Sequence, residues 1–190
     1  INFGDQNIIP IINGLTDFSH PCQILGDYLT IQEIFKNYKK LQISWIGDYN
    51  NVLTSLLHLQ NIYLFKLNVV IPKEILLSKS KILSLYKNKN LKFLSDPLKG
   101  SINSSCIMTD VWLSMGEKNK AKIKYFKNFK INKKIMDSAN KNAIFMHCLP
   151  AKREQEVTSD ILDSKKSVVL QQAKNRMYIQ QAILIYVIKN

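Results

Sequence analysis

Four short patterns in the sequence carry side chains that could bind a small charged molecule. They occur in the following order, with an arginine near the C-terminus: His20-Pro21-Cys22-Gln23, Gly47-Asp48-Tyr49-Asn50-Asn51, Thr109-Asp110-Val111-Trp112-Leu113-Ser114-Met115-Gly116-Glu117, His147-Cys148-Leu149-Pro150 and Arg176. Each falls in or near a loop that borders a predicted strand, which is where open α/β sheets place their ligands. Their common position predicts a ligand site at the strand ends.

The pattern around Asn50 is suited to a carboxylate. A predicted strand runs into Gly47 and then into a helix, so N-terminal N–H groups and the amides of Asn50 and Asn51 could surround a negative group. Asn50 could instead be only the N-cap of that helix. A single Gly-Asp turn lacks the G-x-G-x-x-G fingerprint, so the sequence does not support a dinucleotide site.

The pattern around Asp110 is suited to an ammonium group. A carboxylate there could accept charge-assisted hydrogen bonds, and Ser114 adds a hydroxyl beside it. Trp112 and Gly116 make the same loop a candidate lid, because it combines an apolar anchor with a hinge. The alternative is that Trp112 only anchors an ordinary connection.

The remaining patterns also have structural explanations. A His-Pro pair at a helix start is most often a turn, so His20 alone does not indicate a site. Cys148 could be a small buried hydrophobic residue, which is the commoner role of a free cysteine. Arg176 is harder to explain in this way, because the chain uses lysine for nearly all its other cations and Arg176 lies at a predicted helix start.

The elements that would position these residues alternate between strands and helices. Apolar, β-rich runs predict strands at residues 41–46, 66–71, 91–94, 106–109, 143–147 and 167–170, and helical periodicity predicts helices at 23–38, 50–62, 73–88, 118–127 and 173–188. This alternation is typical of βαβ units. We predict an α/β fold, in which a Rossmann-like parallel sheet with helices on both faces is preceded by the end of a second α/β domain and an interdomain helix.

Composition restricts the class of protein. With 190 residues, of which 46% are hydrophobic and 22% charged, the chain has the balance of one globular domain with a fragment of another. The 3 cysteines form no C-x-x-C pair, which argues against disulfides and structural zinc and favours a reducing, cytoplasmic setting. No segment has the roughly 20 apolar residues that a membrane span needs.

A net charge of +13 would ordinarily suggest nucleic-acid binding. The cations are scattered lysines, however, and only Arg153 and Arg176 offer the planar group favoured for phosphates and base edges. We therefore rank nucleic-acid binding below a solvated, lysine-rich surface.

Taken in order, the patterns HPCQ, GDYNN, DVWLSMGE, HCLP and AKNR are similar to those of ornithine carbamoyltransferases. The resemblance covers nearly the whole chain, and its SMG loop favours ornithine over aspartate or putrescine. It implies transfer of a carbamoyl group from carbamoyl phosphate to ornithine, giving citrulline and phosphate, with no metal and no organic cofactor. It also implies arginine biosynthesis or a urea-type pathway, and a homotrimer when the protein is complete. From the composition we expect a cytoplasmic location and neither a nucleic-acid nor a membrane partner.

The resemblance assigns roles to individual residues. Ornithine would be bound by Asn51, Asp110, Ser114 and Met115, and carbamoyl phosphate by His20, Pro21, Cys22, Gln23, Cys148, Leu149 and Arg176. His20 and Arg176 would stabilise oxyanion charge while the δ-amine attacks the carbonyl carbon. Asp110 and Cys148 could position or deprotonate that amine, whose pKa in water is about 10.4. Departing phosphate is the other candidate base.

Two features depart from the family pattern. The Ser-x-Arg-Thr motif that grips phosphate in this family has no counterpart in the chain, and Lys174 stands where the family usually has an acidic residue. The chain also begins at Ile1 without a signal-peptide pattern, so we expect that most of an amino-terminal carbamoyl-phosphate domain is missing.

We divide the chain into a remnant of that domain with the interdomain helix at residues 1–38, an ornithine-binding domain at 39–170 and a C-terminal helix at 171–190. Alone it should be inactive. The alternative function is a noncatalytic module that binds ornithine or another protein and derives from such an enzyme.

Overall fold

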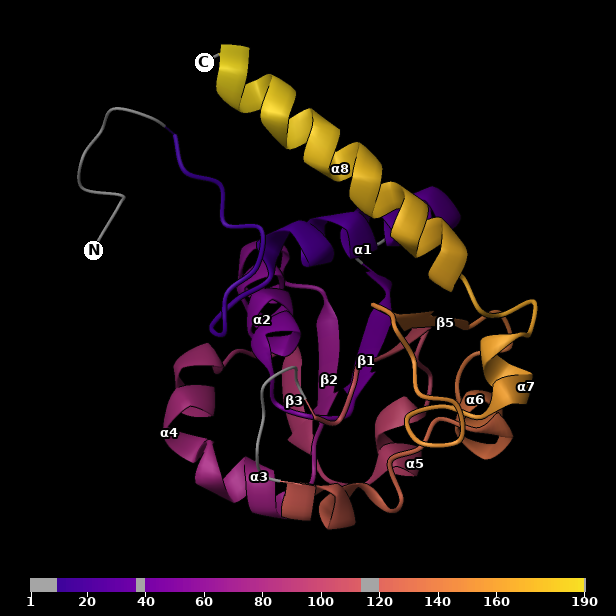
Figure 1. The fold of residues 1–190 in the computed structure, drawn as a ribbon. Helices are drawn as coiled ribbons and strands as arrows, with labels where there is room; N and C mark the ends of the chain where they lie inside the picture. Colours follow the sequence, from indigo (N-terminus) through magenta and orange to yellow (C-terminus); the bar gives the residue numbers. More distant parts are fainter. Residues whose placement is uncertain (1–9, 37–39, 114–119, 190) are drawn as a thin grey trace.

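The computed structural model describes residues 10–36, 40–113 and 120–189, whose central element is a five-stranded parallel sheet (Figure 1). The strands are β1 (Gln42–Ile46), β2 (Lys66–Val70), β3 (Leu91–Leu94), β4 (Cys106–Thr109) and β5 (Ile144–His147). They lie in the order β3-β2-β1-β4-β5, and all neighbours pair in parallel. The chain thus extends the sheet from β1 first to one side and then, from β4, to the other.

Helices connect the strands and surround the sheet, as predicted (Figure 1). They are α1 (Pro21–Ile34), α2 (Asn51–Tyr63), α3 (Lys73–Ser78), α4 (Ser80–Leu83), the 3-10 turn η3 (Ser84–Tyr86), α5 (Pro97–Ser101), the 3-10 helix η4 (Lys120–Phe126), α6 (Lys133–Ser138), α7 (Ser159–Leu162) and α8 (Val169–Lys189). Successive side chains of a strand point to opposite faces, yet every residue of β4 and β5 is buried. The sheet is therefore covered on both faces at these strands.

Polar caps set the starts of several helices. Asn50 caps α2 by accepting a hydrogen bond from the backbone of Leu53, and Asn132 caps α6 in the same way. Asp96 accepts from two backbone N–H groups at the start of α5, where Pro97 occupies the first turn. Such caps satisfy N–H groups that have no partner within the helix.

Three predicted elements differ from the structure. The helix predicted at 118–127 is, within the described residues, the 3-10 helix η4. Residues 167–170 do not form a strand: Ser167 makes only an isolated bridge with Phe145, and α8 begins at Val169. An apolar run this short cannot distinguish strand from helix periodicity. The predicted helix at 73–88 is broken into α3, α4 and η3, where Ser78 and Ser84 donate back to backbone carbonyls and so compete with regular helix bonds.

Helices α1 and α8 pack against one another along one edge of the molecule (Figure 1). Gly26 of α1 makes this close approach possible, because a Cβ there would lie 3.0 Å from Cα of Arg176 in α8. Side-chain bonds from Asn175 to Thr30 and Glu33 join the helices further. No helix within the described ranges, α8 included, is both long enough and apolar enough to cross a membrane.

Candidate active site at the carboxyl ends of the strands

Three of the four patterns meet at the carboxyl ends of neighbouring strands. The loop after β1 carries Asn50, Asp110 directly follows β4, and Cys148 directly follows β5. Chain connections change direction between β1 and β4, and such a switch point leaves a crevice at the strand ends of open α/β sheets. The fold therefore places these three loops where open α/β sheets bind their ligands.

Asp110 is held in a defined orientation by Asn50. The Nδ2 of Asn50 donates to Oδ2 of Asp110 at 2.7 Å, while Oδ1 of the same amide accepts from the Leu53 backbone at 3.0 Å. Asn50 is thus both the helix cap that the sequence suggested and the support for a buried carboxylate. Asp110 can accept charge-assisted hydrogen bonds from an ammonium group at this place.

A glycine lets the loops after β1 and β4 come together. A Cβ on Gly47 would lie 3.1 Å from Oγ1 of Thr109, which itself donates to the Ile46 carbonyl at 2.6 Å. A larger residue would require the Thr109 side chain to shift by a few tenths of an ångström. Gly47 therefore leaves room for the Thr109 hydroxyl where these two loops meet.

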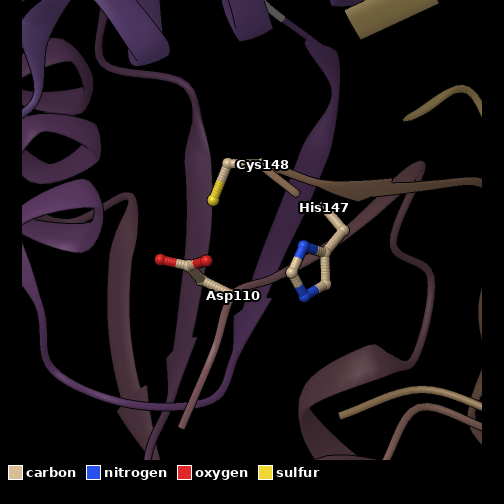
Figure 2. Close-up of side chains that lie close together, drawn as sticks. All are labelled: Asp110, His147 and Cys148. Atoms are coloured by element: carbon tan, nitrogen blue, oxygen red, sulfur yellow. The ribbon is translucent and has the colours of Figure 1, made fainter. Parts of the chain in front are cut away.

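The thiol of Cys148 points toward the carboxylate of Asp110 (Figure 2). Burial raises the pKa of Cys148 well above its usual range, and the charges of Asp110 and Asp27 raise it further, as does the hydrogen bond to Asp110. The side chain is consequently a neutral thiol at neutral pH. A neutral thiol can donate a hydrogen bond to Asp110, but it cannot act as a base until it has lost its proton.

One ring nitrogen of His147 lies with the side-chain ligand atoms of Asp110 and Cys148 within 4.8 Å of one another, so the three could reach one cation. The contacts of His147 do not favour this use. Its Nδ1 accepts from the Leu149 backbone N–H at 2.9 Å, and its Nε2 lies 3.7 Å from Oε2 of the buried Glu156. Metal binding would have to displace one of these contacts and deprotonate Cys148.

A cavity of about 610 Å³ opens beside Cys148, between the sheet end and the α1–α8 pair. Arg176 and Gln172 line it from α8 and Gln23 lines it from α1. Its remaining walls are His147, Cys148, Leu149, Pro150, Ala151, Arg153, Leu162 and Ala173. The structure thus brings Gln23, Cys148, Leu149 and Arg176 to one cavity.

His20 lies at the start of α1, where its backbone N donates to Oγ of Ser55 at 2.8 Å. Burial lowers the pKa of His20, and the charge of Arg176 lowers it further, although the Gly14 backbone and Asp110 act in the opposite direction. The imidazole is therefore neutral at neutral pH. A neutral imidazole can stabilise oxyanion charge by donating a hydrogen bond, but not as a cation.

Three of the predicted residues already have contacts within the chain. Asn51 donates from Nδ2 to the Thr16 carbonyl at 2.7 Å, which ties it to the loop before α1. Pro21 occupies the first turn of α1, and Cys22 is buried with its thiol 3.5 Å from the Asn13 carbonyl. None of the three is among the residues that line the cavity described above.

Ser114 and Met115, expected to bind ornithine, lie outside the described residues. The hypothesis that their loop forms a lid falls there as well. Trp112 lies just before that gap, is buried, and stacks on Phe126 with ring centroids 5.2 Å apart. This contact agrees with the simpler interpretation of Trp112 as an anchor.

Asp27, Gln172 and Glu156 were not assigned any role from the sequence. Asp27 lies one helical turn beyond Gln23, so the spacing could have indicated a contact between the two. Gln172 reaches the same carboxylate from α8, a distance of 145 residues along the chain, and no local pattern predicts that.

Comparison with known proteins agrees with this geometry. Residues 39–187 match the family model described as aspartate/ornithine carbamoyltransferase, Asp/Orn binding domain. The chain belongs to the aspartate/ornithine carbamoyltransferase family. This match includes the loops after β1, β4 and β5 and nearly all of α8.

Carbamoyltransferases of known sequence and structure resemble the chain over nearly its whole length. It is 41% identical over 191 residues to the ornithine carbamoyltransferase of Methanococcus vannielii, which covers 96% of this chain and 63% of that protein. The corresponding enzyme of Prochlorococcus marinus is 43% identical and covers 96% and 61%. The crystal structure of ornithine carbamoyltransferase from Burkholderia thailandensis superposes with a TM-score of 0.84 at 31% identity, over 97% of this chain and 60% of that one. The chain therefore spans about three fifths of the length of its relatives.

Proposed function

We propose that this chain is the ornithine-binding part of an ornithine carbamoyltransferase, which forms L-citrulline and phosphate from L-ornithine and carbamoyl phosphate. The observation that carries the proposal is the placement of Asp110. Its carboxylate is oriented by Asn50 and faces the thiol of Cys148, beside a cavity lined by Gln23 and Arg176. The names of the similar proteins support the same reaction.

On this proposal, Asp110 binds the α-ammonium group of ornithine, because it is a buried, oriented carboxylate at the strand ends. Asn51, Ser114 and Met115 complete the contacts to the amino-acid end. Cys148 remains a neutral hydrogen-bond donor next to Asp110, because burial keeps its pKa high. The δ-amine is then the part of ornithine left to face the cavity.

The carbamoyl group binds between Gln23, Cys148, Leu149 and Arg176, with the His20-Pro21-Cys22-Gln23 turn closing the site. The δ-nitrogen forms a bond to the carbonyl carbon, and the bond from that carbon to the phosphate oxygen breaks. Arg176 stabilises the negative charge that develops on the carbonyl oxygen, and neutral His20 contributes a hydrogen bond. The departing phosphate or Asp110 takes the amine proton.

The same proposal sets the context of the chain. Residues 1–38 belong with a carbamoyl-phosphate domain, residues 39–170 form the ornithine domain and the C-terminal helix follows. The complete enzyme is a homotrimer that serves arginine biosynthesis. A cytoplasmic setting is supported by Cys22, Cys106 and Cys148, which are all free thiols.

Discrimination between ornithine and putrescine tests the proposal. The chain is joined to the carbamoyl-phosphate domain of the Methanococcus vannielii relative, and binding of each amine is measured by calorimetry. Ornithine should bind at least about 100-fold more tightly, because putrescine lacks the α-ammonium and α-carboxylate groups and leaves buried polar groups unpaired. Equal affinity for the two amines would contradict the proposed substrate.

A further inference from the structure

A series of hydrogen bonds joins the end of β5 to the cavity through α8 and α1. It begins at the backbone N–H of His147, which can only donate, and which donates to Oε1 of Gln172 at 3.0 Å. This contact fixes the orientation of the Gln172 amide, because its oxygen must face β5. The Nε2 of Gln172 consequently faces α1, where it donates to Oδ1 of Asp27 at 2.8 Å.

The orientation of Gln23 follows from the same logic. Because Oδ1 of Asp27 accepts from Gln172, that oxygen carries no proton. Gln23 also approaches Oδ1 with its Nε2, at 2.8 Å, and must therefore donate as well. Asp27 thus accepts one hydrogen bond from its own helix and one from α8, and both partners are amide nitrogens.

Only the oxygen of Gln23 is then left for the cavity. Oε1 is buried and has no hydrogen-bond partner among the described residues, although Gln23 lines the cavity. A buried acceptor without a partner is unfavourable unless a ligand supplies a donor. We propose that Asp27 is a positioning residue, which orients Gln23 so that its Oε1 accepts from an N–H group of the ligand. The inference rests on the proposed function for the identity of that group, the NH₂ of the carbamoyl moiety.

Asp27 lies among several ionisable groups. Arg176 faces it from α8, Asp110 from the loop after β4, Cys106 from β4 and Cys148 from the end of β5. Burial raises the pKa of Asp27 from 3.8 to about 7, against the opposing effect of its two amide bonds.

The proton that binds near neutral pH must be on Oδ2, which has no hydrogen-bond partner within the described part of the chain. Both amides therefore keep their acceptor in either charge state. The acceptor is stronger when Asp27 is ionised.

The test uses the whole chain with ¹⁵N-labelled glutamine and follows the side-chain amide signals of Gln23 and Gln172 by NMR as the pH is raised. In the unmodified chain both signals should shift with one shared midpoint, near the Asp27 pKa of about 7. Asp27→Asn keeps an acceptor oxygen of the same shape, so both amides should stay hydrogen bonded while the midpoint disappears. Asp27→Ala removes the acceptor, and both signals should move to the position of exposed glutamines.

Glu33→Gln is the matched control. Glu33 is also on α1 and also accepts from two α8 amides, those of Gln171 and Asn175, but it is exposed and does not line the cavity. This substitution should leave the Gln23 and Gln172 midpoints unchanged. A role in holding α1 and α8 together would be shared by Glu33, whereas a role in orienting Gln23 would not.

Citrulline formation by the chain joined to a carbamoyl-phosphate domain supplies the functional measurement. Asp27→Ala should lower kcat by about 10- to 100-fold, since small misplacements of a substrate-positioning group have effects of this size. Asp27→Asn should stay within about threefold, because the acceptor is retained. If the amides behave as expected but the unmodified enzyme forms no citrulline, the proposed function fails and the positioning of Gln23 stands.

Three results would overturn the inference: a shared midpoint that persists in Asp27→Asn, a Gln23 amide that keeps its signal in Asp27→Ala, or an undiminished kcat in the active Asp27→Ala enzyme. If Asp27→Ala does not fold, the comparison of Asp27→Asn with the unmodified chain decides the matter alone.

Discussion

At the scale of single residues, the site is organised by which polar atoms already have partners. Asn50 uses its oxygen to cap α2 and its nitrogen to hold Asp110. Burial leaves Cys148 as a neutral thiol and lowers the pKa of His20. Two arginines line the described cavity: Arg153 pairs with Asp163, whereas the charge of Arg176 acts on His20 and Asp27. On the proposed function, Arg176 is the group best suited to the negative charge that develops in the reaction.

Asp110→Asn tests the ammonium site directly. The substitution keeps the size of the side chain and an oxygen that can accept from Asn50, but it removes the negative charge. Ornithine affinity measured by calorimetry should fall by about 1–3 kcal/mol, because a charge-assisted hydrogen bond is roughly twice as strong as a neutral one. Thermal unfolding of the variant serves as the control for folding. Unchanged affinity would place the ammonium site elsewhere.

The buried carboxyl of Asp27 should make stability depend on pH. Its pKa is raised from 3.8 to about 7 in the folded state. At pH values between these two, Asp27 is ionised in the unfolded chain but still protonated in the folded chain. Stability is therefore highest below the unfolded pKa and is lost as pH rises toward about 7. Asp27→Asn lacks this loss. Its free energy of unfolding, relative to the unmodified chain, should rise by about 3 kcal/mol between about pH 5 and 8.

Urea denaturation at several pH values measures this difference. Glu33→Gln again provides the comparison, because hydrogen bonds from Asn175 and Gln171 lower the pKa of the exposed Glu33. Glu33 changes stability with pH in the opposite direction to Asp27. Because its pKa is lowered in the folded state, its ionisation stabilises the fold at pH values above its unfolded pKa. If the difference in free energy of unfolding between Asp27→Asn and the unmodified chain did not change with pH, burial would not raise the pKa of Asp27.

The sequence patterns pointed to individual residues and not to the hydrogen bonds between them. One cavity is lined by Gln23, Cys148, Leu149 and Arg176. Short local patterns can indicate such residues, because each loop at a strand end carries its own polar side chains. The bond from Gln172 to Asp27 joins residues 145 positions apart, and no periodicity within either helix specifies it. Buried networks of this kind follow from tertiary packing, so only the structure could reveal them.

At the scale of elements, strands were predicted more accurately than short helices. β3 and β4 have the predicted bounds, because their apolar runs are flanked by polar residues and turns. α5, α6 and α7 were not predicted, since helices of four to six residues are too short to show a hydrophobic period. The caps at Asp96 and Asn132 were the available signals for two of these three.

Gly26→Leu tests the packing of α1 on α8. A side chain at residue 26 would meet the backbone of Arg176, with a Cβ at 3.0 Å from Cα, so the helices would have to separate. We expect a loss of about 1–3 kcal/mol in the free energy of unfolding, despite the better helix propensity of leucine. Gln32→Leu, at an exposed position of the same helix, is the matched control and should be nearly neutral. Equal stability of the two variants would mean that the close approach at Gly26 is not needed.

At the scale of the whole molecule, the site is built from two sides. The sheet supplies Asp110 and Cys148, whereas α1 and α8 supply Gln23 and Arg176. The chain corresponds to about three fifths of its relatives' length, and the Ser-x-Arg-Thr phosphate motif of the family is absent from its sequence. On the proposed function, this sequence carries residues for ornithine without that phosphate motif.

We therefore predict that this chain alone forms no measurable citrulline, and that a separately expressed carbamoyl-phosphate domain from a relative restores activity. Carbamoyl phosphate is an anion, and its binding needs several donors that converge on the phosphate. On the proposed function, the donors that this sequence supplies are His20, Gln23 and Arg176. Exposed lysines cannot replace the others, because they neither form a fixed pocket nor exclude water. Losing even one oxyanion donor typically lowers the rate by about 10²–10³.

The assay measures citrulline with and without the added domain, and His20→Ala should abolish any restored activity. Robust turnover by the chain alone would refute the prediction, whereas inactivity of both preparations would favour the noncatalytic module.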